Sequence, residues 1–176
     1  MKYKQYNKRL LLFLVCSCFY VLYAAAQEVT ENKFSAVKPG SKINFVMDFS
    51  KASIMGMNET DFSNYEKDWN KDKPTIVVRF QKGANGKLGD ILNIGSYPDS
   101  PYTLTVTVKN ISDVGNVYCD AVIIDKDGTV VFSVKDVNGG SEPPILPGTK
   151  LAKIKAWAFL TGRSLGSIIK TEYLNP

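Results

Sequence analysis

The sequence has 176 residues, of which 22 are basic and 17 acidic, and it contains no histidine. The absence of histidine excludes Ser-His-Asp and Cys-His catalysis, and it excludes the common zinc sites built on imidazole. The formal net charge of +5 would favour a polyanionic partner such as nucleic acid, provided that every basic residue stays in the protein.

The first 26 residues have the layout of an export signal. Four basic residues among the first nine precede an uncharged stretch over residues 10–23, and three alanines follow it. The stretch holds 14 residues, which suits a signal and is shorter than the roughly 20 apolar residues that a membrane-spanning helix needs. We therefore expect cleavage between Ala26 and Gln27, and a mature protein in the periplasm or outside the cell.

Two other fates of this segment are compatible with the sequence. Bulky aromatic residues near its end would suit an uncleaved membrane anchor, and the segment 15–18 loosely resembles a bacterial lipobox with Cys18 as the lipid-bearing residue. An alanine run followed at once by Gln27 also resembles the export signals of secreted proteins of the Bacteroidota. That resemblance implies a bacterial envelope protein and no particular activity.

Cleavage changes the charge and the cysteine content of the chain. Four of the 22 basic residues lie in the signal, which leaves 18 against 17 acidic ones, so the overall charge no longer favours nucleic acid. Cys16 and Cys18 leave with the signal, and an intramolecular disulfide is then impossible. The remaining cysteine, Cys119, lies in an apolar run, and we expect it to be buried.

The mature chain is expected to form one domain over residues 42–176, preceded by a polar tether over residues 27–41. Alternating apolar residues over 43–49 predict a strand. Asn58 then has the position of a helix N-cap, with Asp61 three residues later. The predicted helix carries its aromatic residues at helical spacing and ends in the run 70–74; those aromatic residues are Phe62, Tyr65 and Trp69.

Further strands are predicted in the middle of the chain. Residues 76–80 alternate in the manner of a strand, and the turn residues around Gly83 and Gly86 suggest a hairpin with the weaker apolar stretch 88–94. Three threonines alternate with apolar residues over 103–108, which predicts an antiparallel strand with a polar outer face.

The last part of the chain predicts a hairpin and a long helix. Residues 117–124 and 129–135 read as two strands that Asp127 and Gly128 join in a tight turn. Thr149 can cap a C-terminal helix that reaches Ile169. Gly162 and Gly166 in that helix mark either close packing or a break.

This order of elements predicts an α+β fold. We expect a two-layer sandwich in which a mostly antiparallel sheet carries two helices packed on one face. In layout the order resembles small envelope proteins with a strand-helix-meander-helix domain, such as assembly-associated lipoproteins.

Two groups of residues are candidates for partner binding. A basic C-terminal helix could bind anionic lipid, polysaccharide or an acidic protein, or it could simply be a solvated face. Exposed aromatic residues, together with the Gly- and Pro-rich loop 139–144, could line a carbohydrate- or peptide-binding rim, or they could belong to ordinary connections. The candidate residues are Lys150, Lys153, Lys155, Arg163, Tyr97 and Tyr102.

Possible catalytic and metal-binding patterns are weaker. Asp48, Glu59 and Asp61 could pair as acid and base in glycoside hydrolysis, although helix capping already explains two of them. The segment 125–128 resembles the start of a calcium loop, but its flanking strands favour a hairpin. We assign no catalytic, cofactor or metal residue.

The sequence favours an exported, non-enzymatic module that binds an envelope protein or a glycan, and the alternative is a carboxylate-dependent hydrolase of envelope or dietary glycans.

Overall fold

Seven strands form one mixed sheet in the computed structural model, which describes residues 27–141 and 148–176. The strands are β1 (Glu28–Asn32), β2 (Ser41–Asp48), β3 (Ser53–Ile54), β4 (Leu92–Gly95), β5 (Tyr102–Ile111), β6 (Val117–Asp125) and β7 (Val130–Val137). Their order is β1-β7-β6-β5-β2-β4, and β3 pairs with the end of β5. Strands β1, β7, β6 and β5 pair antiparallel with one another in that order, whereas β2 runs parallel to both β5 and β4. The expected signal, with both of its cysteines, lies outside the described residues.

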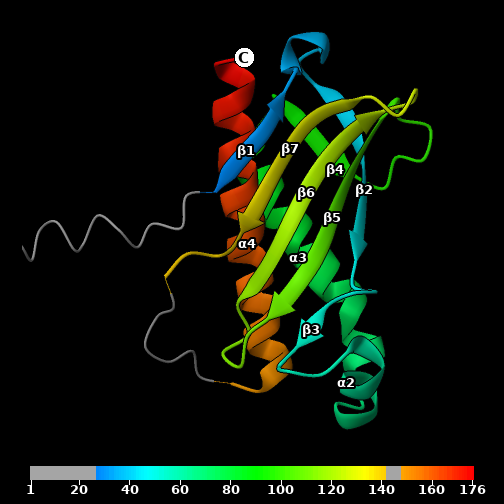
Figure 1. The fold of residues 1–176 in the computed structure, drawn as a ribbon, viewed down its shortest axis with the longest axis vertical. Coiled ribbons are helices and arrows are strands. Elements are labelled where there is room, and N and C mark those ends of the chain that lie inside the picture. Colours follow the sequence, from blue (N-terminus) through cyan, green and yellow to red (C-terminus); the bar gives the residue numbers. More distant parts are fainter. Residues whose placement is uncertain (1–26, 142–147) are drawn as a thin grey trace, which may run out of the picture.

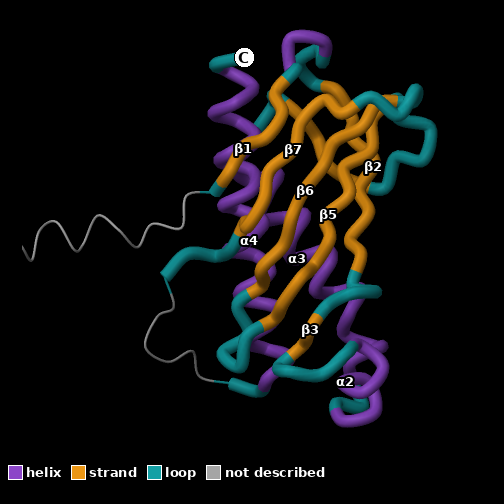
Figure 2. Tube along the Cα trace, in the orientation of Figure 1, coloured by secondary structure: helices purple, strands orange, loops and turns teal. Residues whose placement is uncertain are grey.

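Two long helices cover one face of this sheet, and two short ones lie at its ends (Figure 1). They are η2 (Phe34–Ala36, a 3-10 turn), α2 (Glu59–Tyr65), α3 (Trp69–Leu88) and α4 (Lys150–Leu174). The long helices α3 and α4 lie side by side behind the sheet in Figure 1, and no described helix covers the face toward the viewer (Figures 1 and 2). The predicted α+β sandwich with two helices on one face is therefore confirmed.

The first of these two helices is one that the sequence assigned to strands. Residues 76–80 belong to α3, and so do the expected turn at Gly83 and Gly86 and the chain as far as Leu88. The buried residues recur at the helical spacing of four, and they are Ile76, Phe80, Ala84 and Leu88. Val78, which the strand pattern would bury with its neighbours, is 44% exposed. A run of five residues is too short to distinguish the strand period of two from the helical period of 3.6. The repeat of buried residues over the longer segment 76–88 identifies it as a helix.

The hairpin expected after Gly86 is also wrong. β4 follows α3 and pairs in parallel with β2, from Ser41 beside Leu92 to Asn44 beside Gly95. A parallel neighbour requires a crossover connection, and α3 supplies it across the covered face of the sheet. The run 70–74 does not end a helix either, because Pro74 lies inside α3.

Glycines allow α3 and α4 to approach each other at backbone contact. A Cβ on Gly162 would lie 2.1 Å from the carbonyl oxygen of Phe80, and one on Gly83 would lie 2.1 Å from that of Phe159. Gly166 meets Ala84 in the same way. Of the two readings of Gly162 and Gly166, close packing is therefore correct, and α4 continues unbroken through both.

The expected tether is largely part of the domain. β1 pairs with β7 at the edge of the sheet, and η2 places Phe34 in the core, where its ring stacks on Phe132 at 5.1 Å. The Tyr173 hydroxyl of α4 donates to the Val37 carbonyl at 2.8 Å. The buried side chains of Phe34 and Val37 and the pairing of β1 with β7 together hold this polar segment on the domain.

Several local predictions are confirmed. The Asn58 side chain accepts from the backbone amide of Asp61 at 2.9 Å, and Thr149 caps α4. β6 and β7 form the predicted hairpin, in which Gly128 has the left-handed φ of +81°. The aromatic stripe is only partly correct, because Tyr65 is 56% exposed where α2 ends.

Cys119 lies in the core on β6, as predicted, and is fully buried. Removal from water disfavours the thiolate, so burial raises the pKa of the Cys119 thiol. In the part of the chain that is described, we find no helix with the length and apolar character needed to cross a membrane.

Candidate functional site

The structure places Tyr97 and Tyr102 at the opposite end of the molecule from Lys150 and Lys153, whereas Arg163 lies near the middle of α4. Tyr97 and Tyr102 lie where β5 begins, next to the start of β2. Lys150 and Lys153 lie in the first turn of α4, which is at the bottom of Figure 1, whereas the connection that carries Tyr97 is at the upper right. A compact ligand bound beside Tyr97 therefore does not reach Lys150 or Lys153.

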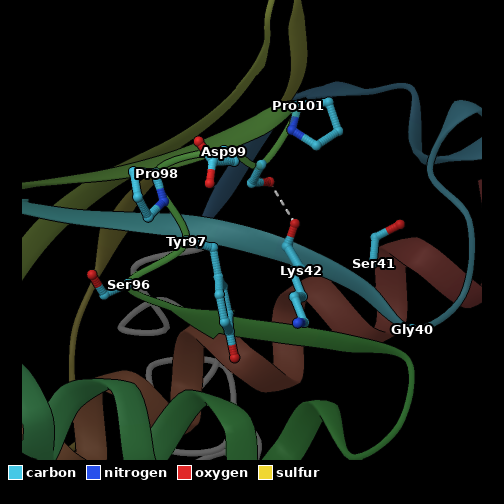
Figure 3. Close-up of a pocket in the computed structure, with 9 residues that line it drawn as sticks. Gly40, Ser41, Lys42, Ser96, Tyr97, Pro98, Asp99 and Pro101 are labelled. Carbon is cyan, nitrogen blue, oxygen red and sulfur yellow. Dashed lines mark hydrogen bonds between the residues drawn. The ribbon is translucent and has the colours of Figure 1, made fainter.

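A hollow of about 600 Å³ opens beside Tyr97 (Figure 3). It lies where the segment 96–101 crosses over β2, because the strands that this segment joins, β4 and β5, flank β2. Ile43 and Phe45 point to the helices, so Lys42 and Asn44 point to the open face of the sheet. The lining residues are Gly40, Ser41, Lys42, Ser96, Tyr97, Pro98, Asp99, Ser100 and Pro101.

Hydrogen bonds to β2 fix the crossing segment. The Ser100 hydroxyl donates to the Lys42 carbonyl at 2.6 Å and accepts from the Tyr102 amide at 3.0 Å. The Asn44 side-chain oxygen accepts from the Tyr97 amide at 3.2 Å. The segment 96–101, which forms one wall of the hollow, is therefore attached to β2 near both of its ends.

The Tyr97 ring forms one side of this hollow, as Figure 3 shows. It packs closely on Gly95, where an added Cβ would lie 2.9 Å from a ring carbon. The Lys42 ammonium lies 5.2 Å from the ring centroid, and the exposed residue Asp99 also lines the hollow. The Ser41 and Ser100 hydroxyls donate to the backbone carbonyls of Lys38 and Lys42. The Tyr97 ring, Ser96, the Lys42 ammonium and the Asp99 carboxylate remain as donors and acceptors, and this set suits an uncharged ligand rich in hydroxyl groups.

Tyr102 and the described part of the loop, residues 139–141, do not line this hollow. The Tyr102 hydroxyl donates to the carbonyl of Ala36, the last residue of η2, at 3.3 Å. Gly139 packs on Trp157 of α4, and its amide donates to the Asn116 side chain. Residues 142–144 of the loop lie outside the described part of the chain.

The basic residues of α4 differ in their surroundings. Lys150 donates to the Tyr65 hydroxyl and lies 4.1 Å from the centroid of that ring. Lys155 forms an ion pair with Asp72 of α3 at 2.7 Å. Lys153 is half-buried, and Arg163 is exposed with its guanidinium 6.0 Å from the Phe159 ring.

The three candidate carboxylates each bind local partners. Glu59 accepts from the Trp69 indole at 3.1 Å and pairs with Lys73. Asp48 accepts from the Ser50 amide at 2.8 Å, and this hydrogen bond lowers the pKa of Asp48. Asp61 accepts from the Asn58 side-chain amide. These contacts give each carboxylate a structural role.

Asp125 shapes the β6–β7 turn. Its carboxylate accepts from the amides of Asp127 and Thr129 at 2.9 and 2.8 Å. Within residues 27–141 and 148–176, no three His, Cys, Asp or Glu side chains are grouped in a way that could hold a metal ion.

Sequence reasoning missed Ser41, Lys42 and Asp99. Strand alternation around Ile43 could have placed Lys42 on the outer face. Its proximity to Tyr97 follows only from the parallel pairing of β2 with both β4 and β5. An aromatic residue beside a proline in a short connection was the one local signal for this site.

The fold and the hollow define a class: a two-layer α+β sandwich with an open polar site where β2 and β5 begin. No protein-family model matches the chain, and no curated protein matches it. Among solved structures, it is similar to PelC from Paraburkholderia phytofirmans, described as a dodecamer, with a TM-score of 0.44 and 13% identity over 80% of this chain and 98% of PelC. A DUF330 protein from Xanthomonas campestris aligns with a TM-score of 0.38 and 11% identity, over 85% and 95% of the two chains. These likenesses assign no ligand.

Proposed function

We propose that this chain is an exported, non-enzymatic module of a bacterial envelope or secretome, and that it binds a glycan in the hollow beside Tyr97. The first 26 residues support export, because they have the basic, apolar and small-residue regions of a signal in order. Their resemblance to signals of the Bacteroidota supports a bacterial source of that type.

The observation that carries the glycan assignment is the chemistry of the hollow. Sugar rings present C–H groups on their faces and hydroxyls on their edges, so they match an aromatic ring flanked by charged and hydroxyl groups. Tyr97 supplies the ring with the Lys42 ammonium beside it, and Ser96 and Asp99 line the same open cavity. A non-catalytic role is supported by the carboxylates Asp48, Glu59 and Asp61, whose described partners are structural.

The test is binding of the mature chain, beginning at Gln27, to a panel of bacterial and plant glycans. For the glycan that binds best, Tyr97→Ala should weaken binding at least tenfold, which corresponds to about 1.4 kcal/mol, whereas Tyr97→Phe should keep most of it. Tyr102→Phe is the matched control, because that hydroxyl contacts the protein outside the hollow.

Two results would contradict the proposal. One is a panel without binding, or with binding that Tyr97→Ala leaves unchanged. The other is cleavage of a bound glycan that is lost when Asp48, Glu59 and Asp61 are changed to alanine, which would favour the hydrolase instead.

A further inference from the structure

The helix layer, formed by α3 and α4, is strongly basic although the mature chain as a whole is nearly neutral. Of the 18 basic residues after the expected signal, ten lie in α3 and α4, and these two helices contain only two acidic residues, Asp72 and Glu172. The rest of the mature chain therefore has eight basic and 15 acidic residues. The helix layer is strongly positive and the remainder is negative.

A groove runs along the outer side of α4 within this layer. Two hollows of about 480 and 380 Å³ meet at Leu160, and we call them together the α4 groove. A row at four-residue spacing forms part of its lining: Ala152, Ala156, Leu160, Ser164 and Ile168. At 1.5 Å per residue this row is about 24 Å long.

The α4 side chains of the first hollow are mainly apolar, those of the second mix Leu160 and Ile168 with Ser164 and Ser167, and cationic side chains border both. Ala152 and Ala156 are exposed and small, whereas Phe159 and Leu160 are half-buried and recessed. Arg79 and Lys87 of α3 and Arg163 of α4 line the same hollows, and they make no ion pair within the described ranges.

We propose that the α4 groove docks an amphipathic helical segment of another protein, one that has small and apolar residues on one face and acidic residues beside it. Rows at four-residue spacing interdigitate when helices pack, and two alanines one turn apart let a second backbone approach closely. The unpaired cations select an acidic partner. A membrane surface fits less well, because its contact requires apolar side chains that protrude beyond the charges, and here they are recessed.

The probe is a dye-labelled synthetic helical peptide of about 18 residues, long enough for the groove. It carries Leu and Ala on one face and Glu on both flanks. We expect saturable binding to the mature chain by fluorescence anisotropy, with affinity that falls as salt is raised. The double variant Arg79→Glu/Arg163→Glu should weaken binding at least tenfold, and Ala156→Trp should weaken it by filling the groove.

The control variant Lys38→Glu/Lys126→Glu makes the same change of net charge on exposed residues outside the groove, and it should leave binding within about twofold of the unchanged protein. Thermal unfolding of each variant separates lost binding from lost folding.

The proposal is wrong if the Glu peptide does not bind, if a peptide with Lys flanks binds equally, or if both double variants behave alike. Preferential binding to phosphatidylglycerol vesicles would assign the layer to a membrane instead. None of these results bears on glycan binding beside Tyr97, so the two proposals fail separately.

Discussion

At the scale of single residues, Glu59 shows how a candidate catalytic group becomes a structural one. Its carboxylate accepts from the indole of Trp69, which is fully buried, and pairs with Lys73, whose ammonium lies 4.9 Å from the Phe49 ring centroid. Phe49 and Phe62 meet Trp69 edge to face at 5.7 and 5.2 Å. One carboxylate therefore holds the aromatic cluster between α2, α3 and the end of β2.

We predict that Glu59→Ala lowers the free energy of unfolding by about 1–3 kcal/mol, because the buried Trp69 N–H loses its acceptor. Glu59→Gln keeps an acceptor oxygen and loses only a partly exposed ion pair, which is worth about 0–1 kcal/mol. Urea unfolding followed by tryptophan fluorescence measures both. Equal losses for the two variants would show that the indole hydrogen bond contributes little.

At the scale of elements, the strands β5 to β7 and the two helix caps follow from local pattern, whereas α3 does not. Its sequence has β-branched residues at 75–78, a proline at position 74 and two internal glycines, all of which disfavour a helix. Packing overrides these preferences, since Gly83 is buried against the Phe159 backbone of α4. The glycine that suggested a turn is present because a side chain would separate the helices.

The two kinds of glycine in this layer should therefore respond differently to alanine. Gly162→Ala places a Cβ against the Phe80 carbonyl and should cost about 1–3 kcal/mol or more, through separation of α3 from α4. Gly86→Ala is the matched control, because that site in α3 has open space and alanine favours helix, with an expected gain of about 1 kcal/mol. Thermal or urea unfolding tests both. A stabilising Gly162→Ala would contradict the contact.

At the scale of the whole molecule, the fold converts a neutral composition into two oppositely charged sides. The sequence distributes acidic and basic residues along its length, and the packing of α3 beside α4 gathers ten cations in one layer. At 0.1 M salt, the electrostatic attraction of such a cationic layer for an anionic partner extends over about 10 Å. The basic helix predicted from sequence is thus half of a larger cationic surface, to which α3 contributes Arg79, Lys82 and Lys87.

This separation predicts that the mature chain is retained on a cation-exchange column at neutral pH and low salt, despite its net charge near zero. Arg79→Glu/Arg163→Glu should elute at distinctly lower salt than Lys38→Glu/Lys126→Glu, although their net charges are identical. Co-elution of the two variants would mean that net charge, and not its distribution, controls retention.

The sequence by itself determined what depends on near neighbours: the capping residues Asn58 and Thr149, the hairpin at Gly128, the alternation of β5 and the burial of Cys119. It also determined the class of fold, because the order of elements limits how apolar faces can be covered. Only the tertiary structure decided that residues 76–88 are helical, that β4 lies parallel to β2, and that Lys42 stands beside Tyr97. These three outcomes depend on contacts between segments far apart in the chain, whose packing free energy exceeds the local preferences of the residues involved.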